Sequence, residues 1–191
     1  MYYNRKKTII KNATFIIAIL ALAIIATYNI YYHFKGSTDI EYSSESLEIT
    51  FHEKTGAKVA LTKSIPVSDS VGLSSQAYTF TIKNNLTIPV EYQINITEDI
   101  EKIIDDLCQE KQIPKELLRI SIKENNSKNQ IYFLSELENG ILTNTEIEAL
   151  GEVDYSIRIW LYNSETISIG NDLHYHGIIQ VLENGHDLAI R

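Results

Sequence analysis

Residues 77–97 read AYTFTIKNNLTIPVEYQINIT, with large apolar side chains at every second position on both sides of two asparagines. A period of two predicts half-buried β-strands, because successive side chains of a strand point to opposite faces. Asparagine tolerates positive φ and favours a tight reversal, so Asn84 and Asn85 indicate a hairpin over these residues. Pro89 cannot donate a hydrogen bond to a ladder, which is typical of a strand beginning or an edge.

The same alternation returns along much of the chain from residue 47 onward. Further strands are expected at Leu47–Phe51, Leu117–Lys123, Gln130–Leu134, Glu152–Tyr162 and Tyr175–Glu183. Residues 98–112 differ, because their apolar side chains follow helical spacing and Thr97 can cap the first turn; they are Ile100, Ile103, Ile104, Leu107 and Cys108. Strands that do not alternate with helices predict an all-β fold, a two-sheet antiparallel β-sandwich with one amphipathic helix crossing between the sheets.

An uncharged, apolar segment precedes the strands. As a helix, residues 14–32 would reach roughly 28 Å, close to the hydrocarbon thickness of a bilayer, so they predict a transmembrane helix. Four basic residues lie within the first eleven positions, and they place the N-terminus in the cytoplasm and the rest outside. A cleaved signal peptide is the rival interpretation, with Ala21-Leu22-Ala23 as the triplet that a signal peptidase would recognise.

The sequence thus divides into a cytoplasmic basic segment (1–13), a transmembrane helix (14–32), a juxtamembrane spacer (33–46) and an extracellular β-sandwich domain (47–191). The expected location is the cell membrane, with the lipid bilayer as the partner of the helix. After residue 11, 13 basic residues stand against 25 acidic ones, a formal charge of −12 that argues against nucleic acid as a partner. Cys108 is the only cysteine, so packing rather than an intramolecular disulfide must hold the domain.

Three segments resemble the surface β-sandwich proteins of the TasA and camelysin type in Gram-positive bacteria. They are residues 65–70 leading into 78–85, then 150–161, then 176–181. The resemblance implies a jelly-roll-like sandwich exported to the cell surface, where some relatives polymerise into extracellular fibres such as those of a biofilm. Those fibre-forming relatives lose their N-terminal segment, whereas the segment in this chain is expected to be retained.

Two histidines are the candidate metal ligands. His174 and His176 occupy alternate positions of a strand, so both imidazoles project from one face, and His186, a short loop away, is expected to complete the site. Together they define an alternative function, a cell-surface hydrolase that uses zinc; the other interpretation is exposed histidines near a strand end. His52 does not begin a helical zinc-protease motif, because position 56 is glycine rather than histidine.

Trp160 is the candidate centre of a binding surface. It shares one face of the strand at residues 152–162 with Arg158 and Tyr162, and it departs from the polar character of that face. Aromatic side chains on a surface bind glycans or partner chains, but in a sandwich they mostly pack in the interior or under a loop. Both interpretations of Trp160 remain open at this point.

Signatures of catalysis are missing from the sequence. No serine lies in a Gly-x-Ser-x-Gly motif, no glycine-rich loop is arranged to hold phosphate, and no cofactor is expected. The sequence therefore favours a membrane-anchored extracellular structural or binding module rather than an enzyme. Its expected partner is a like subunit or a cell-envelope protein, which it would engage by adding a strand at an open sheet edge.

Overall fold

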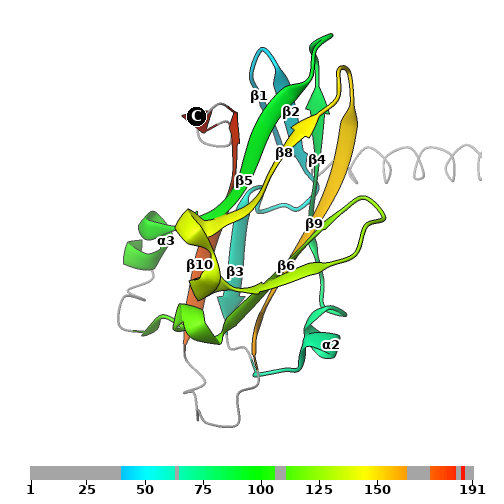
Figure 1. Cartoon of the computed structure of the whole chain (residues 1–191). Helices are drawn as coiled ribbons and strands as arrows, with labels where there is room; N and C mark the ends of the chain where they lie inside the picture. The colour runs from blue at the N-terminus through cyan, green and yellow to red at the C-terminus, as the bar shows by residue number, and fades with distance from the viewer. Residues whose placement is uncertain (1–39, 63–64, 106–110, 163–172, 184–185, 188–191) are drawn as a thin grey trace, which may run out of the picture. The chain divides into compact units, whose positions relative to one another are not determined.

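The computed structural model describes residues 40–62, 65–105, 111–162, 173–183 and 186–187, and more than half of these residues form β-strands (Figure 1). The strands are β1 (Ile40–Ser43), β2 (Leu47–Phe51), β3 (Lys58–Thr62), β4 (Tyr78–Asn84), β5 (Val90–Glu98), β6 (Leu118–Glu124), β7 (Gln130–Phe133), β8 (Ile141–Ile147), β9 (Glu152–Leu161), β10 (His174–Glu183) and β11 (His186–Asp187). The helical segments are short: α2 (Asp69–Gly72), α3 (Ile100–Asp105) and the 3₁₀ turns η2 (Lys115–Leu117), η3 (Leu134–Glu136) and η4 (Glu138–Gly140).

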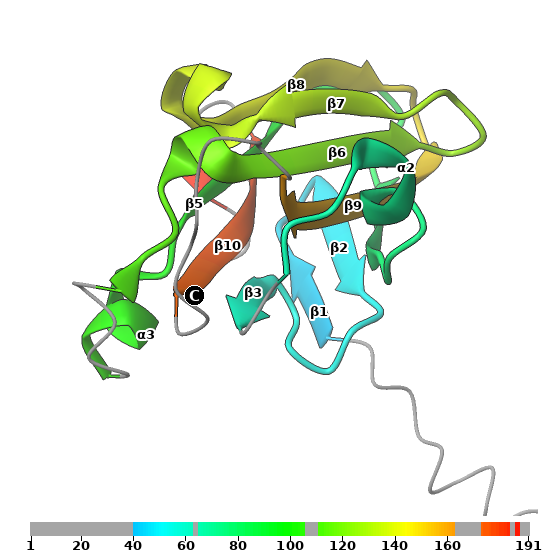
Figure 2. The same cartoon turned by 90° about the horizontal axis from the view of Figure 1, so that it is seen from below.

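Two antiparallel sheets enclose the core. One has the order β1-β2-β4-β9-β6-β7, and the other has the order β11-β10-β5-β8, with β3 also paired to β10. The two helices lie on different sheets, α2 against β9 and α3 against β10 (Figure 2). The predicted all-β architecture of two antiparallel sheets is therefore confirmed.

Alternate side chains from both sheets fill the space between them. The rings of Phe51, Phe80 and Tyr155 follow one another across β2, β4 and β9, with centroids 5.1 Å and 5.4 Å apart. From the other sheet, Tyr92 reaches the same cluster, and its hydroxyl lies 2.6 Å from that of Tyr155. Each fully buried large side chain contributes about 1.5–3 kcal/mol to folding, which is how a domain without disulfides is held together.

The hairpin expected over residues 77–97 is wrong. The strands β4 and β5 form there, but β4 pairs with β2 and β9, and β5 pairs with β10 and β8. The asparagine turn therefore passes from one sheet to the other. The buried side chain of Asn84 stabilises this connection between the sheets. Its amide donates to the carbonyls of Ile88 (2.7 Å) and Glu148 (3.0 Å), and its oxygen accepts from the Leu86 amide (2.8 Å).

The folded part of the chain begins earlier than residue 47. Residues 40–43, expected to belong to a polar spacer, form β1 and pair with β2 from Ile40 opposite Phe51 to Ser43 opposite Glu48. A serine turn connects them, in which the hydroxyl of Ser44 accepts from the Leu47 amide at 2.9 Å. The compact unit that contains β1 starts at residue 39.

The expected helix over residues 98–112 is shorter and starts differently. Thr97 belongs to β5, and Asp99 caps α3 by accepting from the Lys102 amide at 3.1 Å. Of the predicted apolar side chains, Ile103 is buried, whereas Ile100 and Ile104 are exposed. Leu107 and Cys108 lie outside the described residues. The helix does stand in the connection between β5 and β6, which belong to different sheets, as the sequence predicted.

The predicted transmembrane segment, residues 14–32, also lies outside the described residues. Among the helices that the structure describes, none is long and apolar enough to cross a membrane.

Candidate functional site

The two candidate metal ligands lie together at the start of β10. Their rings are nearly parallel, with centroids 6.1 Å apart and an interplanar angle of 15°, because alternate residues of a strand share a face. His174 is half-buried and His176 is 6% exposed. The shared face predicted for these two side chains is therefore present.

His186 is not near this pair. It lies on β11 opposite Glu183, seven residues beyond His176 on β10, which corresponds to about 23 Å along the strand. The expectation that His186 completes the site is therefore wrong, because the chain returns beside the far end of β10. Within the described residues, no group of three His, Cys, Asp or Glu side chains is arranged to hold a metal ion.

A buried carboxylate lies next to His176. Asp99 is 2% exposed, its backbone amide donates to the His176 carbonyl at 3.1 Å, and its Oδ2 lies 3.0 Å from Lys58 Nζ. Burial by itself would raise the pKa of the Asp99 carboxyl, but the Lys102 amide, the Lys58 ammonium and His176 together hold that pKa below its usual value. This ionised carboxylate connects α3, β3 and β10, which is a structural role.

The face that carries Trp160 is covered rather than open. The indole is 3% exposed and lies against Gly72 at the end of α2. Arg158 donates from Nε to the Ser75 carbonyl at 3.0 Å, in the turn that follows α2. Packing under a connecting segment is thus the interpretation that matches the position of Trp160, and its ring is not part of an exposed binding surface.

An ion pair holds α2 in its position over Trp160. Arg119 on β6 lies beside Asp69 of α2, with Nη2 and Oδ2 3.0 Å apart. Its guanidinium also stacks on two rings, 4.0 Å from the centroid of Phe133 and 5.1 Å from that of Tyr162. The side chain of Tyr162 therefore supports Arg119, and the three candidate binding residues hold α2 in place.

A polar groove of about 310 Å³ on the outer face of the six-stranded sheet was not foreseen. His52 Nε2 lies 2.9 Å from the hydroxyl of Thr81, and that hydroxyl donates to Asp154 Oδ1 at 2.7 Å. The Asp154 amide in turn donates to the side-chain oxygen of Asn125 at 3.0 Å. Because these four residues come from four separated segments, spacing along the chain gave no signal for the groove.

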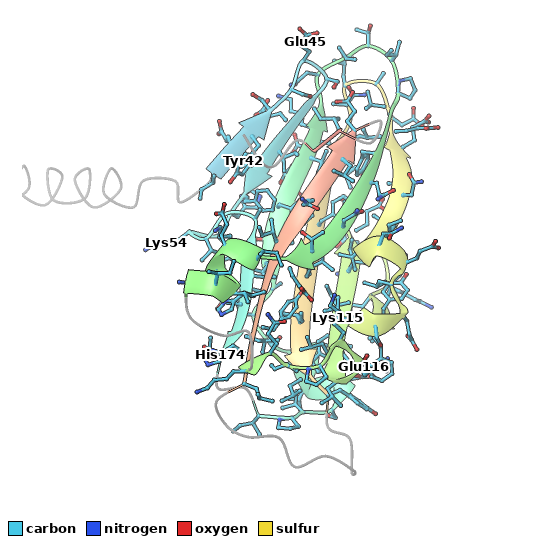
Figure 3. All side chains as sticks on the ribbon, turned by 90° about the vertical axis from the view of Figure 1, so that its left-hand side faces the viewer. Tyr42, Glu45, Lys54, Lys115, Glu116 and His174 are labelled. Atoms are coloured by element: carbon cyan, nitrogen blue, oxygen red, sulfur yellow. The ribbon has the colours of Figure 1, made fainter. Side chains whose placement is uncertain are left out.

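A larger pocket, of about 490 Å³, lies where β5 ends and β10 begins. Its lining includes apolar side chains from β5 and η3 together with Glu98, Lys115 and Tyr175, and Glu98 Oε1 lies 2.8 Å from Lys115 Nζ. Figure 3 shows Lys115 toward the same end of the domain as His174 and away from Glu45. For Tyr175 the only signal in the sequence was the alternation of apolar residues along β10, and that signal indicated a core residue rather than a pocket residue.

The edges of the sheets are the last candidate surface. Strand β8 pairs with β5 through residues 141–147, and none of the described strands pairs with its other edge. Strands β1 and β7 end the six-stranded sheet in the same way, with four residues each. Unpaired edge groups can accept a strand from another chain.

Comparisons of this chain with protein-family models, with curated proteins and with solved structures find no match.

Proposed function

We propose that the protein is a membrane-anchored extracellular structural or binding module that engages a like subunit or a cell-envelope protein through strand addition. In this proposal residues 14–32 anchor the chain in the cell membrane, with the N-terminus in the cytoplasm. The length and lack of charge of that segment and the basic residues before it support the orientation. The all-β domain and its resemblance to TasA-like proteins support a surface role.

The open edge of β8 is the observation that carries the proposal. It is the longest of the described strands that end a sheet, with seven residues, and it contains no proline. Its only charged side chain is Glu146, which is exposed together with Asn144. Edge strands are commonly protected by lysine, proline or bulges. In β8 the register is irregular at Leu142, but residues 143–147 pair regularly with β5 and leave a regular outer edge that carries one charged side chain. Strand addition at β8 is therefore the mode of association we favour.

A lysine at this edge tests the proposal. In Asn144→Lys, a long cation replaces an exposed polar side chain, so pairing with a neighbouring strand should be impeded while the fold is retained. The matched control is Thr50→Lys on β2, which has strands on both sides. In sedimentation velocity with the full chain in detergent, we expect wild type and Thr50→Lys to self-associate and Asn144→Lys to remain monomeric. A monomeric wild type that also adds no strand from envelope extracts would refute the proposal.

The anchor requires its own experiment. Protease added to intact cells should digest the domain, and alkaline extraction should leave the full-length chain in the membrane fraction. A chain that is recovered in the cytosol, or a mature N-terminus after Ala23, would contradict the anchor as proposed.

The alternative is a cell-surface metal-dependent hydrolase that uses His174 and His176. One observation favours it, the placement of both imidazoles on one face of β10. Metal analysis of untagged protein should then show one zinc per chain in the wild type and none in His174→Ala. Absence of zinc at stoichiometric level from wild type loaded with zinc and dialysed would remove this alternative.

A further inference from the structure

The pocket at the end of the two sheets combines an apolar wall with a pair of opposite charges. Ile96 and Leu134 are buried in its lining, Leu137 is half-buried, and Ile100 on α3 stands at its rim with 56% of its surface exposed. A volume of about 490 Å³ falls within the range of small-molecule sites. The apolar part of the pocket therefore has room for an aliphatic or aromatic side chain.

The charged pair spans the same pocket. Glu98 is the last residue of β5, and Lys115 is the first residue of η2, the turn before β6. Their charged groups meet at 2.8 Å. Their side chains are 30% and 50% exposed, which leaves both groups within reach of a solute. Each can exchange its present partner for a ligand group of the same charge.

Tyr175 adds a hydroxyl group to the lining of the same pocket. The residue as a whole is 4% exposed and lines the pocket, and its hydroxyl, which has no hydrogen-bond partner among the described residues, is accessible from the pocket rather than buried. The ring lies over Gly177, where a Cβ atom would come within 2.7 Å of the hydroxyl oxygen, and Glu98 stands opposite that glycine in the ladder. Burial and then the charge of Glu98 raise the pKa of the phenol, so it remains protonated and able to donate.

We propose that this pocket binds a small zwitterion with an apolar side chain, namely a free apolar α-amino acid. Its ammonium group would pair with Glu98, its carboxylate would accept from Lys115 and from the Tyr175 hydroxyl, and its side chain would pack on Leu134, Leu137 and Ile100. Such a ligand replaces both partners of the ion pair and also gives the Tyr175 hydroxyl a hydrogen-bond partner. A simple anion would be repelled by Glu98, and a purely apolar ligand would desolvate the ion pair and leave the Tyr175 hydroxyl without a partner.

Calorimetric titration of the full chain in detergent with L-leucine and with L-phenylalanine tests this inference. N-acetyl-L-leucine, which lacks the ammonium group, and L-leucinamide, which lacks the carboxylate, are the matched ligands. We expect at least one of the two amino acids to bind and both capped leucines to bind at least tenfold more weakly than L-leucine. Binding of neither amino acid, or equal binding of the capped forms, would overturn the proposal.

Variants locate the site independently of the ligand series. Tyr175→Phe removes only the hydroxyl and Lys115→Met removes the cation, and each should weaken amino-acid binding about tenfold. Lys128→Met removes an exposed lysine in the loop between β6 and β7, at the opposite end of β6 from η2, and should leave binding unchanged. If Tyr175→Phe fails to fold by circular dichroism, Lys115→Met decides, because its side chain is half exposed. Unchanged binding in Lys115→Met would refute this site while leaving the proposed strand addition untouched.

Discussion

At the scale of single residues, Gly72 decides whether α2 can cover Trp160. A Cβ atom at this position would collide with the indole ring, so only glycine allows the close approach. Because α2 lies over it, the only tryptophan of the chain is buried although it is on the outward face of β9. A residue without a side chain therefore determines that Trp160 is a packing residue.

Substitution of Gly72 by alanine should lift α2 from the sheet. Overpacking of this kind typically costs about 1–3 kcal/mol, so we expect a lower melting temperature. We also expect a red shift of the tryptophan fluorescence, which reports on this site because Trp160 is the only tryptophan. Val71→Ala, on the same helix and 54% exposed, is the control and should change neither quantity. A Gly72→Ala protein with wild-type stability and emission would contradict this packing.

Asp99 should make stability depend on pH in the acid range. Its pKa is lowered in the folded state, so the stabilisation is present above the pKa of an unfolded aspartate, about 3.9, and is lost as the pH falls through the folded value. Asp99→Asn should therefore unfold more easily in urea than wild type at pH 7, by about 2 kcal/mol for the lost charged hydrogen bonds.

The difference between Asp99→Asn and wild type should shrink as the pH falls below the pKa of an unfolded aspartate and then through the lowered pKa of the folded state, where the wild-type carboxyl also becomes neutral. Glu116→Gln, at an exposed position on η2, serves as the control and should show no such convergence. A difference that stays constant from pH 7 to pH 3 would show that the side chain acts through shape rather than charge.

At the scale of elements, the passage from β4 to β5 depends on one buried amide. Asn84 donates to the carbonyls of Ile88, Ile147 and Glu148 and accepts from one backbone amide, and it is fully buried. Its donors reach the loop before β5 and the turn after β8, so a single side chain ties together two connections at the same end of the sheets. The adjacent Asn85, in contrast to the buried Asn84, is exposed.

Asn84→Asp should distinguish these two asparagines. An aspartate has the same shape, but its oxygens would face the carbonyls of Ile88 and Glu148 without a donor, which should cost about 1–3 kcal/mol or more in urea unfolding. Asn85→Asp should change stability by less than about 0.5 kcal/mol, as is usual at exposed positions. Equal effects of the two substitutions would argue against the sheet-crossing arrangement.

At the scale of the whole molecule, the acidic charge opposes the association that we propose. The chain after residue 11 carries a formal charge of −12, so two copies repel each other beyond their contact surface. Salt screens charges separated by more than about 8–10 Å at physiological ionic strength, whereas backbone hydrogen bonds between strands depend on it little.

Self-association through β8 should therefore strengthen as salt increases. In sedimentation velocity at 20 mM and 500 mM NaCl, chosen to lie on the two sides of physiological screening (about 150 mM), the dimer fraction of the wild type should rise with salt. Asn144→Lys should stay monomeric at both concentrations. A dimer that dissociates as salt is added would point to ion pairs between the copies instead of strand addition.

Local patterns sufficed for many of the strands. Alternation at β4, β5, β6, β9 and β10 located them closely, because one face of each strand is apolar and the other is polar or half-buried. The sequence pattern did not predict strands β1, β3 and β8, because they are short or carry threonine and asparagine where a core strand has isoleucine. On such edge strands, pairing with a neighbour rather than burial determines the conformation.

The amino-acid order alone determined the all-β character of the domain, its dependence on packing without a disulfide, and the shared face of His174 and His176, because these follow from period and composition within single segments. Tertiary structure alone decided that β4 and β5 separate into different sheets, that Trp160 is covered, that His186 lies far from the other histidines, and that Glu98, Lys115 and Tyr175 meet in one pocket. The reason is physical: a turn signal reverses the chain but does not choose its partner, and the lowest free energy is reached when distant apolar faces are buried together.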